Sequence, residues 1–222
     1  MKPLIELNSV SKTYQSSRES VKALIEINLK LNQGDYVSIV GPSGAGKSTL
    51  LHIIGGLDAP SRGSVLFRDK NIYRLRDKEI SLWRRHHIGF VFQFYHLIEE
   101  LNALENVALV LDFPGKESSL KKIEELLQYL GIEDRKTFFP SQLSGGEKQK
   151  VAIARALVND PEIVLCDEPT GNLDKESQEK VVDLLERLNK DKGKTIVLVT
   201  HNTELARRAG RNAVIKEGRV VQ

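Results

Sequence analysis

The residues best suited to chemistry form one glycine-rich segment, Gly41-Pro42-Ser43-Gly44-Ala45-Gly46-Lys47-Ser48. Thr49 follows it directly. The segment matches the pattern G-x-x-x-x-G-K-[ST], with an apolar run before it and a helical pattern after it. Glycines let the backbone N–H groups point inward, the helix N-terminus adds partial positive charge, and Lys47 adds a full charge near the terminal phosphates. Ser48 offers an oxygen to Mg²⁺. The sequence therefore predicts a nucleotide-phosphate site in preference to an accidental tight turn.

Two adjacent acids are placed to complete this site, because Asp167 and Glu168 follow the apolar run Ile163–Cys166. We expect Asp167, at the strand end, to support Mg²⁺, and Glu168 to orient or deprotonate the attacking water. A strand that merely ends in solvated acids is the alternative. The phosphate loop elsewhere in the chain favours the catalytic interpretation.

The elements that must position these groups are visible as hydrophobic patterns. We expect strands at Leu4–Val10, Val37–Val40, Val65–Phe67, Ile88–Phe92, Ile163–Cys166 and Thr195–Thr200. We expect helices at Lys47–Ile54, within Ala103–Leu130, at Glu147–Val158 and at Lys175–Asn189. The alternation of helix and strand after Pro140 predicts a parallel sheet. The helical stretch before it predicts an inserted helical subdomain.

Composition restricts the class of protein. A chain of 222 residues with 40% hydrophobic and 28% charged residues fits one elaborated globular domain. Its net charge of +3 is too small to indicate a nucleic-acid ligand. The single cysteine, Cys166, excludes an internal disulfide and is expected to be a small buried hydrophobe. With no apolar run near the roughly 18 residues of a membrane helix and no secretory leader, we expect a soluble protein that is not exported.

A further segment indicates which class of nucleotide-binding protein this is. Leu143-Ser144-Gly145-Gly146-Glu147, with the helical run to Leu157, closely resembles the signature motif of ABC-type ATPases. Alone, the pattern could be only a helix N-cap. The resemblance spans essentially the whole chain and implies an α/β fold with a RecA-like P-loop ATPase core, an antiparallel β subdomain and an inserted α-helical subdomain. It implies one nucleotide-binding domain over residues 1–222, with the core and β subdomain at about 1–93 and 159–222 and the helical subdomain at about 94–158.

The resemblance also assigns roles to single residues. Ser144, Gly145 and Gly146 would contact the γ-phosphate of ATP held by the opposite subunit, so that an ATP-bound homodimer encloses two nucleotides. Asp174, in the loop Gly171–Asp174, would lie at the dimer interface, or would cap the next helix.

Three further positions match those of the family. Tyr14 would stack on adenine, Gln93 would reach Mg²⁺ and the attacking water, and His201 would contact the γ-phosphate. An exposed turn tyrosine, a polar strand-end residue and a strand-end histidine are the respective alternatives. The implied catalytic residues are Glu168, His201, Gln93 and Lys47; the implied metal ligands are Ser48, Gln93 and Asp167; and the cofactors are ATP and Mg²⁺.

Other segments resemble the branch of lipoprotein-releasing and macrolide-export ATPases, among them Gly55–Asp58, Phe92–Leu97 and Leu104–Val107. The branch implies ATP hydrolysis that drives transport through separate transmembrane permease subunits. The chain would then lie peripherally on the cytoplasmic side of the inner (plasma) membrane, with Phe94–Leu97 as a partner contact or core packing. The basic cluster Arg84–His87 would contact a membrane partner or form a solvated helix face.

Two rival functions stay open. One is a cell-division-type ABC ATPase that regulates a membrane partner without transport. The other is a soluble ABC ATPase that acts on nucleic acid. About fifty residues separate Gln93 from Ser144, without sustained heptads or extra cysteines, which argues against the second rival. No nucleic-acid partner is expected.

Overall fold

The core of the protein is a six-stranded sheet with the order β10-β9-β3-β8-β7-β6. The computed structural model describes residues 2–15, 19–111 and 116–221. Strands β3, β6, β7, β8 and β9 are parallel, and β10 is antiparallel to β9. Their bounds are β3 Tyr36–Val40, β6 Ile88–Phe92, β7 Ile163–Asp167, β8 Thr195–Val199, β9 Arg211–Lys216 and β10 Arg219–Val221. The continuous apolar sequences of β7 and β8 suit strands covered on both faces.

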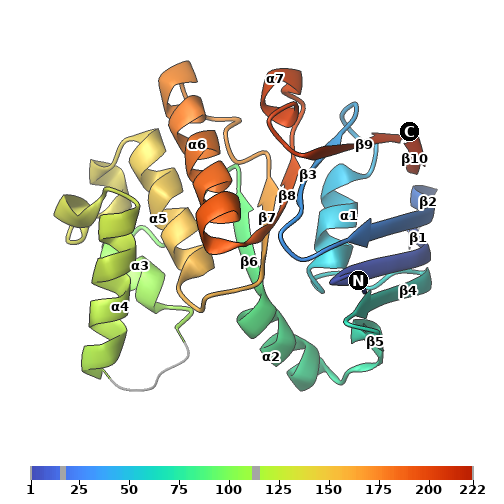
Figure 1. Cartoon of the computed structure of the whole chain (residues 1–222), viewed down its shortest axis with the longest axis horizontal. Helices are drawn as coiled ribbons and strands as arrows, with labels where there is room; N and C mark the ends of the chain where they lie inside the picture. The colour runs from blue at the N-terminus through green and yellow to red at the C-terminus, as the bar shows by residue number, and fades with distance from the viewer. Residues whose placement is uncertain (1, 16–18, 112–115, 222) are drawn as a thin grey trace.

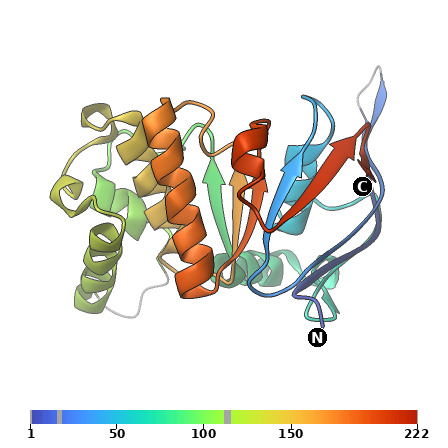
Figure 2. The same ribbon diagram turned by 45° about the horizontal axis from the view of Figure 1, so that its top comes forward.

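A second, antiparallel sheet has the order β2-β1-β4-β5. Its strands are β1 Ile5–Gln15, β2 Ser20–Leu31, β4 Arg62–Phe67 and β5 Lys70–Asn71. Helix α1, Lys47–Ile54, lies between the two sheets (Figure 1), and its buried residues share one core cluster with strands of both. The parallel strands of the central sheet run in one direction, so their carboxyl ends meet at one edge (Figure 2). Loops at that edge therefore hold side chains that are far apart in sequence close together.

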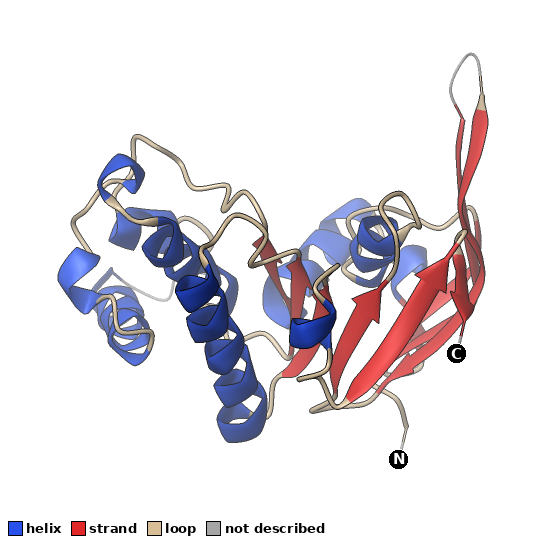
Figure 3. Ribbon diagram, turned by 90° about the horizontal axis from the view of Figure 1, so that it is seen from above, coloured by secondary structure: helices blue, strands red, loops and turns tan. Residues whose placement is uncertain are grey.

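Helices lie on the side of the molecule away from the antiparallel sheet, and Figure 3 shows this helical side apart from the strand-rich side. They are α3 Ala103–Ala108, α4 Lys116–Tyr129, α5 Gly145–Leu157 and α6 Lys175–Lys192. Apolar stripes of α4, α5 and α6 form a second core cluster with Val164, Cys166 and Leu198 of the central sheet. Helix α2, Asp77–His87, precedes β6, and the short helix α7, Thr203–Ala206, follows β8. Short 3-10 turns occupy Ile72–Arg74, Glu133–Arg135 and Pro140–Gln142.

Every expected strand and helix coincides with an observed element, and the expected parallel sheet is present. The boundaries differ. Strand β1 continues past Val10 to Gln15, α5 begins at Gly145, and α6 continues to a glycine cap at Gly193. The helical stretch expected within Ala103–Leu130 is α3 and α4, with residues 112–115 outside the described part. Strands β2, β5, β9 and β10 were not expected from the sequence.

Candidate active site

The glycine-rich loop joins β3 to α1 at the carboxyl edge of the central sheet. Gly46, the N-cap of α1, has φ +100°, in the left-handed region that favours glycine. A Cβ atom at this position would lie 2.3 Å from the carbonyl oxygen of Ala23 in β2. Glycine is therefore required at Gly46 by both conformation and space, and the loop passes directly beneath β2.

Lys47 is nearly buried, with 8% of its surface exposed. Its Nζ donates hydrogen bonds to the carbonyl oxygens of Gly41, at 2.9 Å, and Pro42, at 3.0 Å. The ammonium group is thus folded over its own loop, where an anion above the loop would meet a preorganised positive charge. The loop borders a cavity of about 460 Å³, which is lined by Val21, Lys22, Ala23, Ser43, Gly44, Gly46, Lys47, Ser48, Thr49, Gln93, Glu168 and His201.

Asp167 ends β7 beside the phosphate loop, and its Oδ1 accepts a hydrogen bond from Ser48 Oγ at 3.1 Å. Burial raises the pKa of Asp167, although the bond from Ser48 opposes that shift. Within the described residues, no group of three or more His, Cys, Asp or Glu side chains could hold a metal ion. Two adjacent oxygen ligands suit Mg²⁺, which takes most of its ligands from phosphates and water. Ser48 and Asp167 therefore fit this ion.

Glu168 follows with φ +47°, a left-handed conformation uncommon for a residue with a side chain. Its backbone N–H donates to Val199 O at 2.9 Å, which ties the residue to β8. Its Oε2 accepts from the backbone N–H of His201 at 3.2 Å and lies 3.0 Å from His201 Nδ1. The carboxylate is thereby aimed at the cavity beside His201. In this position it could take a proton from a water molecule.

Gln93, directly after β6, lines the same cavity and is paired with Asn172. Its Nε2 donates to Asn172 Oδ1 at 3.1 Å, and Asn172 Nδ2 donates to the carbonyl oxygen of Gln93 at 3.2 Å. A Cβ atom at Gly171 would approach Gln93 Nε2 to 2.7 Å. The glutamine is therefore coupled to the loop Gly171–Asp174, a contact that the sequence did not predict.

Asp174 is the N-cap of α6, since its Oδ1 accepts from the backbone N–H of Ser177 at 3.0 Å. Backbone and side-chain hydrogen bonds from Ser177 lower the pKa of the Asp174 carboxyl. The capping role considered from the sequence is present.

Ser144 opens α5 in a capping box with Glu147. Its backbone N–H donates to Glu147 Oε2 at 2.8 Å, and its Oγ accepts from the backbone N–H of Glu147 at 3.3 Å. Arg135 Nε lies 2.8 Å from Glu147 Oε1 and holds that side chain in turn. The three residues Ser144, Gly145 and Gly146 do not line the cavity of the phosphate loop. The helix N-terminus is ordered but lies outside the site formed by its own chain.

Tyr14 lies near the end of β1, opposite Val21 of β2, and 42% of its surface is exposed. Because Val21 lines the cavity, Tyr14 lies at its border without lining it. The wall formed by Val21, Lys22 and Ala23 was missed in the sequence. These residues belong to strand β2, and only a prediction of that strand could have indicated them. The irregular hydrophobic pattern of β2 did not predict a strand.

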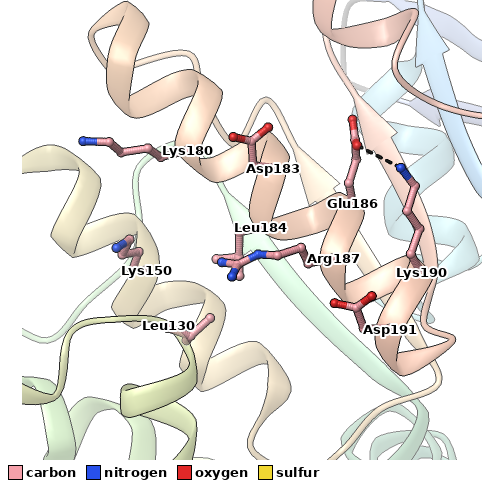
Figure 4. Close-up of a pocket in the computed structure, with 9 residues that line it drawn as sticks. All are labelled: Leu130, Lys150, Lys180, Asp183, Leu184, Glu186, Arg187, Lys190 and Asp191. Atoms are coloured by element: carbon pink, nitrogen blue, oxygen red, sulfur yellow. Dashed lines mark hydrogen bonds and ion pairs between the residues drawn. The ribbon is translucent and has the colours of Figure 1, made fainter.

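A different cavity, of about 490 Å³, lies between α5 and α6 and is bordered by charges of both signs (Figure 4). Glu186 pairs with Lys190 at 3.3 Å. Arg208 also binds Glu186, together with Asp183 and Glu179. None of the predicted site residues borders this cavity. The four predicted catalytic residues, Lys47, Gln93, Glu168 and His201, border the cavity of the phosphate loop instead.

Comparison with known proteins agrees with this geometry. A family model described as ABC transporter matches residues 24–171. The lipoprotein-releasing system ATP-binding protein LolD of Geobacter metallireducens is 47% identical, over 100% of this chain and 99% of the relative. An uncharacterized ABC transporter ATP-binding protein of Thermotoga maritima is 45% identical, over 99% and 94%.

A solved structure is also similar: a dimeric, post-hydrolysis state of the ATP-binding cassette MJ0796 bound to ADP and Pi. It superposes with a TM-score of 0.91 at 45% identity, and the match covers 98% of this chain and 97% of that one. The predicted α/β P-loop ATPase fold is thereby confirmed. The family match and this full-length similarity lead to one conclusion: the chain belongs to the ABC transporter family, as one of its ATP-binding, ATP-hydrolysing subunits.

Proposed function

We propose that this chain hydrolyses ATP as an ATP-sandwich homodimer and thereby drives lipoprotein release through separate transmembrane permease subunits. One observation carries the catalytic part. Lys47 and Ser48 of the phosphate loop border one cavity together with Gln93, Glu168 and His201, which come from three other segments of the chain. A nucleotide placed with its phosphates on the loop would present its γ-phosphate to the last three of these side chains.

In this proposal the loop N–H groups and Lys47 bind the phosphates, with Thr49 also at the start of α1. Ser48, Asp167 and Gln93 would hold Mg²⁺, whose chemistry is to neutralise developing phosphate charge. Glu168 orients the attacking water and takes its proton, and His201 contacts the γ-phosphate. The bond from His201 N–H holds the Glu168 carboxylate in place for that transfer.

The dimer is proposed because the signature residues lie away from the site where their own chain would bind ATP, so they can contact only the ATP of another copy. Ser144 and its two glycines begin a well-capped helix of 13 residues, whose N-terminus favours an anion. They lie outside the cavity of the phosphate loop. A second copy would bring its own bound ATP to this helix end, as the dimeric form of the solved relative allows.

The permease contact is proposed at a cavity of about 610 Å³ between α2, β6, α5 and the segment that follows α3. It is lined by apolar Leu57, Ile88, Phe90, Phe92, Ile98, Leu109 and Val110, and by basic Arg84, Arg85 and Arg155. The apolar lining suits the apolar face of a helix, and the arginines suit acidic side chains beside it. No helix in the described part of the chain is long and apolar enough to cross a membrane. The membrane spans would belong to the partner.

The loop after Gln93 is built to transmit such a contact. Tyr95 and His96 both have positive φ, +59° and +51°. Arg155 of α5 donates to their carbonyl oxygens, at 2.7 Å and 2.5 Å. Phe94, with 67% of its surface exposed, projects from the same loop. Helix α5 thus joins the partner-facing loop to the signature residues at its other end.

The remaining parts of the proposal rest on the family. The core and β subdomain would comprise about 1–93 and 159–222, and the helical subdomain about 94–158. The chain would lie on the cytoplasmic side of the inner membrane. Lipoprotein release is favoured because relatives of matching length are named for it. Macrolide-type export and a cell-division role are the alternatives.

The test is copurification of tagged Glu168→Gln protein from native membranes with ATP, followed by mass spectrometry. We expect a polytopic permease with a large extracytoplasmic domain, and a bound lipoprotein would support release as the function. A permease with a cell-wall hydrolase regulator would support the cell-division alternative instead. Recovery of soluble or nucleic-acid-bound proteins alone would overturn the transport assignment while leaving the ATPase chemistry intact.

A further inference from the structure

The hydroxyl group of Tyr14 is held by a charged cluster that none of the roles above uses. Tyr14 donates a hydrogen bond to Asp58 Oδ2 at 2.7 Å. The other oxygen of the same carboxylate, Oδ1, is bound by Lys12 Nζ at 2.5 Å. Lys12 also donates to the carbonyl oxygen of Ala59 at 2.7 Å. These contacts tie the end of β1 to the segment that follows α1.

The cluster is sheltered, whereas the aromatic ring is accessible. The side chain of Lys12 is 12% exposed and that of Asp58 29%, compared with 42% for Tyr14 as a whole. The ammonium group of Lys12 lies 4.9 Å from the ring centroid of Tyr14, over its face. Burial would raise the pKa of Asp58, but hydrogen bonds from Lys12 and Tyr14 outweigh it and lower that pKa. Asp58 is therefore a charged acceptor at neutral pH, and Lys12 covers one side of the ring.

The backbone of Asp58 is fixed to α1. The hydroxyl oxygen of Tyr73 lies 2.6 Å from the carbonyl oxygens of both Ile53 and Asp58, so these two acceptors share its single proton. The backbone N–H of Leu57 donates to His52 O at 2.9 Å. Asp58 is thus a firm extension of the helix whose other end carries Lys47 and the phosphate loop.

We infer that Lys12 and Asp58 are positioning residues for nucleotide binding: they set the plane of the Tyr14 ring relative to α1, so that one rigid unit holds both the base and the phosphates. This inference rests on the proposed role of Tyr14 as the surface on which adenine stacks. A ring held at its hydroxyl and covered on one side loses little freedom when a base stacks on it. A merely structural ion pair would instead stabilise the fold without distinguishing ligands that have a base from those that do not.

The experiment measures dissociation constants of the purified full chain for Mg-ATP and for inorganic tripolyphosphate, which has no base. We expect Asp58→Asn and Lys12→Met to weaken ATP binding about 3- to 10-fold, as for the loss of one or two hydrogen bonds. Both variants should leave tripolyphosphate binding unchanged. Lys12→Arg should keep ATP affinity close to that of the unsubstituted protein, because the guanidinium group can still bind Asp58 and cover the ring.

A matched control breaks an ion pair in the same sheet. Glu6 of β1 pairs with Lys30 of β2 at 3.0 Å, at the opposite end of the two strands. Glu6→Gln should change neither dissociation constant. If it weakened ATP binding as much as Asp58→Asn, the effect would belong to the sheet as a whole, and the inference would be wrong.

Tyr14→Ala separates failure of the inference from failure of the proposed function. Loss of base stacking should weaken ATP binding about 5- to 150-fold and spare tripolyphosphate. If Tyr14→Ala has that effect but Asp58→Asn and Lys12→Met do not, only the inference is overturned. If the cluster variants weaken both ligands in parallel, the cluster has a structural role alone, and the inference again fails. If Tyr14→Ala changes nothing, the stacking role and the inference fall together, and the assignment of Glu168 stands.

Discussion

Replacing Glu168 with glutamine is the most direct test of the catalytic site. The change removes the basic oxygen but keeps the shape of the side chain. The remaining carbonyl oxygen can still accept the hydrogen bond from the backbone N–H of His201, now 3.2 Å from Oε2. Nucleotide binding should therefore persist, because Lys47 and the loop N–H groups are untouched.

The size of the effect follows from the role assigned to the carboxylate. A positioned general base contributes about 10²- to 10⁴-fold to a rate, so the barrier should rise by about 3 to 5 kcal/mol. The assay is steady-state phosphate release at saturating Mg-ATP, with ATP affinity measured on the same preparation. The ATP-bound dimer should also accumulate on size exclusion, since hydrolysis no longer dissociates it.

The control for this variant is Glu204→Gln. Glu204 is exposed in the first turn of α7, three residues beyond His201, and does not border the cavity. The substitution changes the net charge equally, so turnover should stay at its original level. Unchanged turnover in Glu168→Gln, with Glu204→Gln also active, would refute Glu168 as the base. Loss of ATP binding in Glu168→Gln would show that the carboxylate maintains the site rather than the chemistry.

Three other predictions concern the dimer, the loop and the metal. Ser144→Arg should leave ATP binding by the monomer intact and abolish hydrolysis, because the long cation blocks the helix N-terminus. Equilibrium ATP binding and phosphate release are the two measurements. A parallel loss of both would place the serine in the site of its own chain. Gly46→Ala should abolish nucleotide binding and lower the free energy of unfolding by more than Gly34→Ala does. Both glycines have positive φ, but only at Gly46 would a Cβ clash, 2.3 Å from Ala23 O. The shared conformational cost is about 1 to 2 kcal/mol, and equal losses in denaturant titration would contradict the clash. Chelation with EDTA should stop hydrolysis and added Mg²⁺ should restore it, whereas hydrolysis in EDTA would exclude a metal at Ser48 and Asp167.

Much of the candidate site was predictable from the sequence because its residues directly follow apolar strands. Gly41, Gln93, Glu168 and His201 all occur within two residues of the end of a parallel strand. Parallel strands bring their carboxyl ends to one edge, so four local patterns predict one site. The glycine loop was predictable without tertiary information, because the pattern that identifies it consists of consecutive residues.

Strand β2 was missed for a physical reason. Its buried residues Leu24, Ile27 and Leu31 are spaced by three and four, as on a helix, rather than by two. The pairing of β1 with β2 contains register shifts, and Glu26 has φ +51°, so irregularities break the alternation that marks a strand. Only pairing with β1 makes this segment a strand and brings Val21 to the cavity.

The sequence by itself determined the phosphate loop, the paired acids, the signature helix and the presence of strands β3, β6, β7 and β8, because each depends on neighbouring residues and on hydrophobic period. The order of the strands in the sheet was known only from the structure. Tertiary structure alone decided which side chains hold these groups in place. Gln93 meets Asn172 across 79 positions, and Asp58 meets Tyr14 across 44. Such contacts arise when separate strands and loops pack together, and neither partner of a pair carries a local pattern that identifies the other.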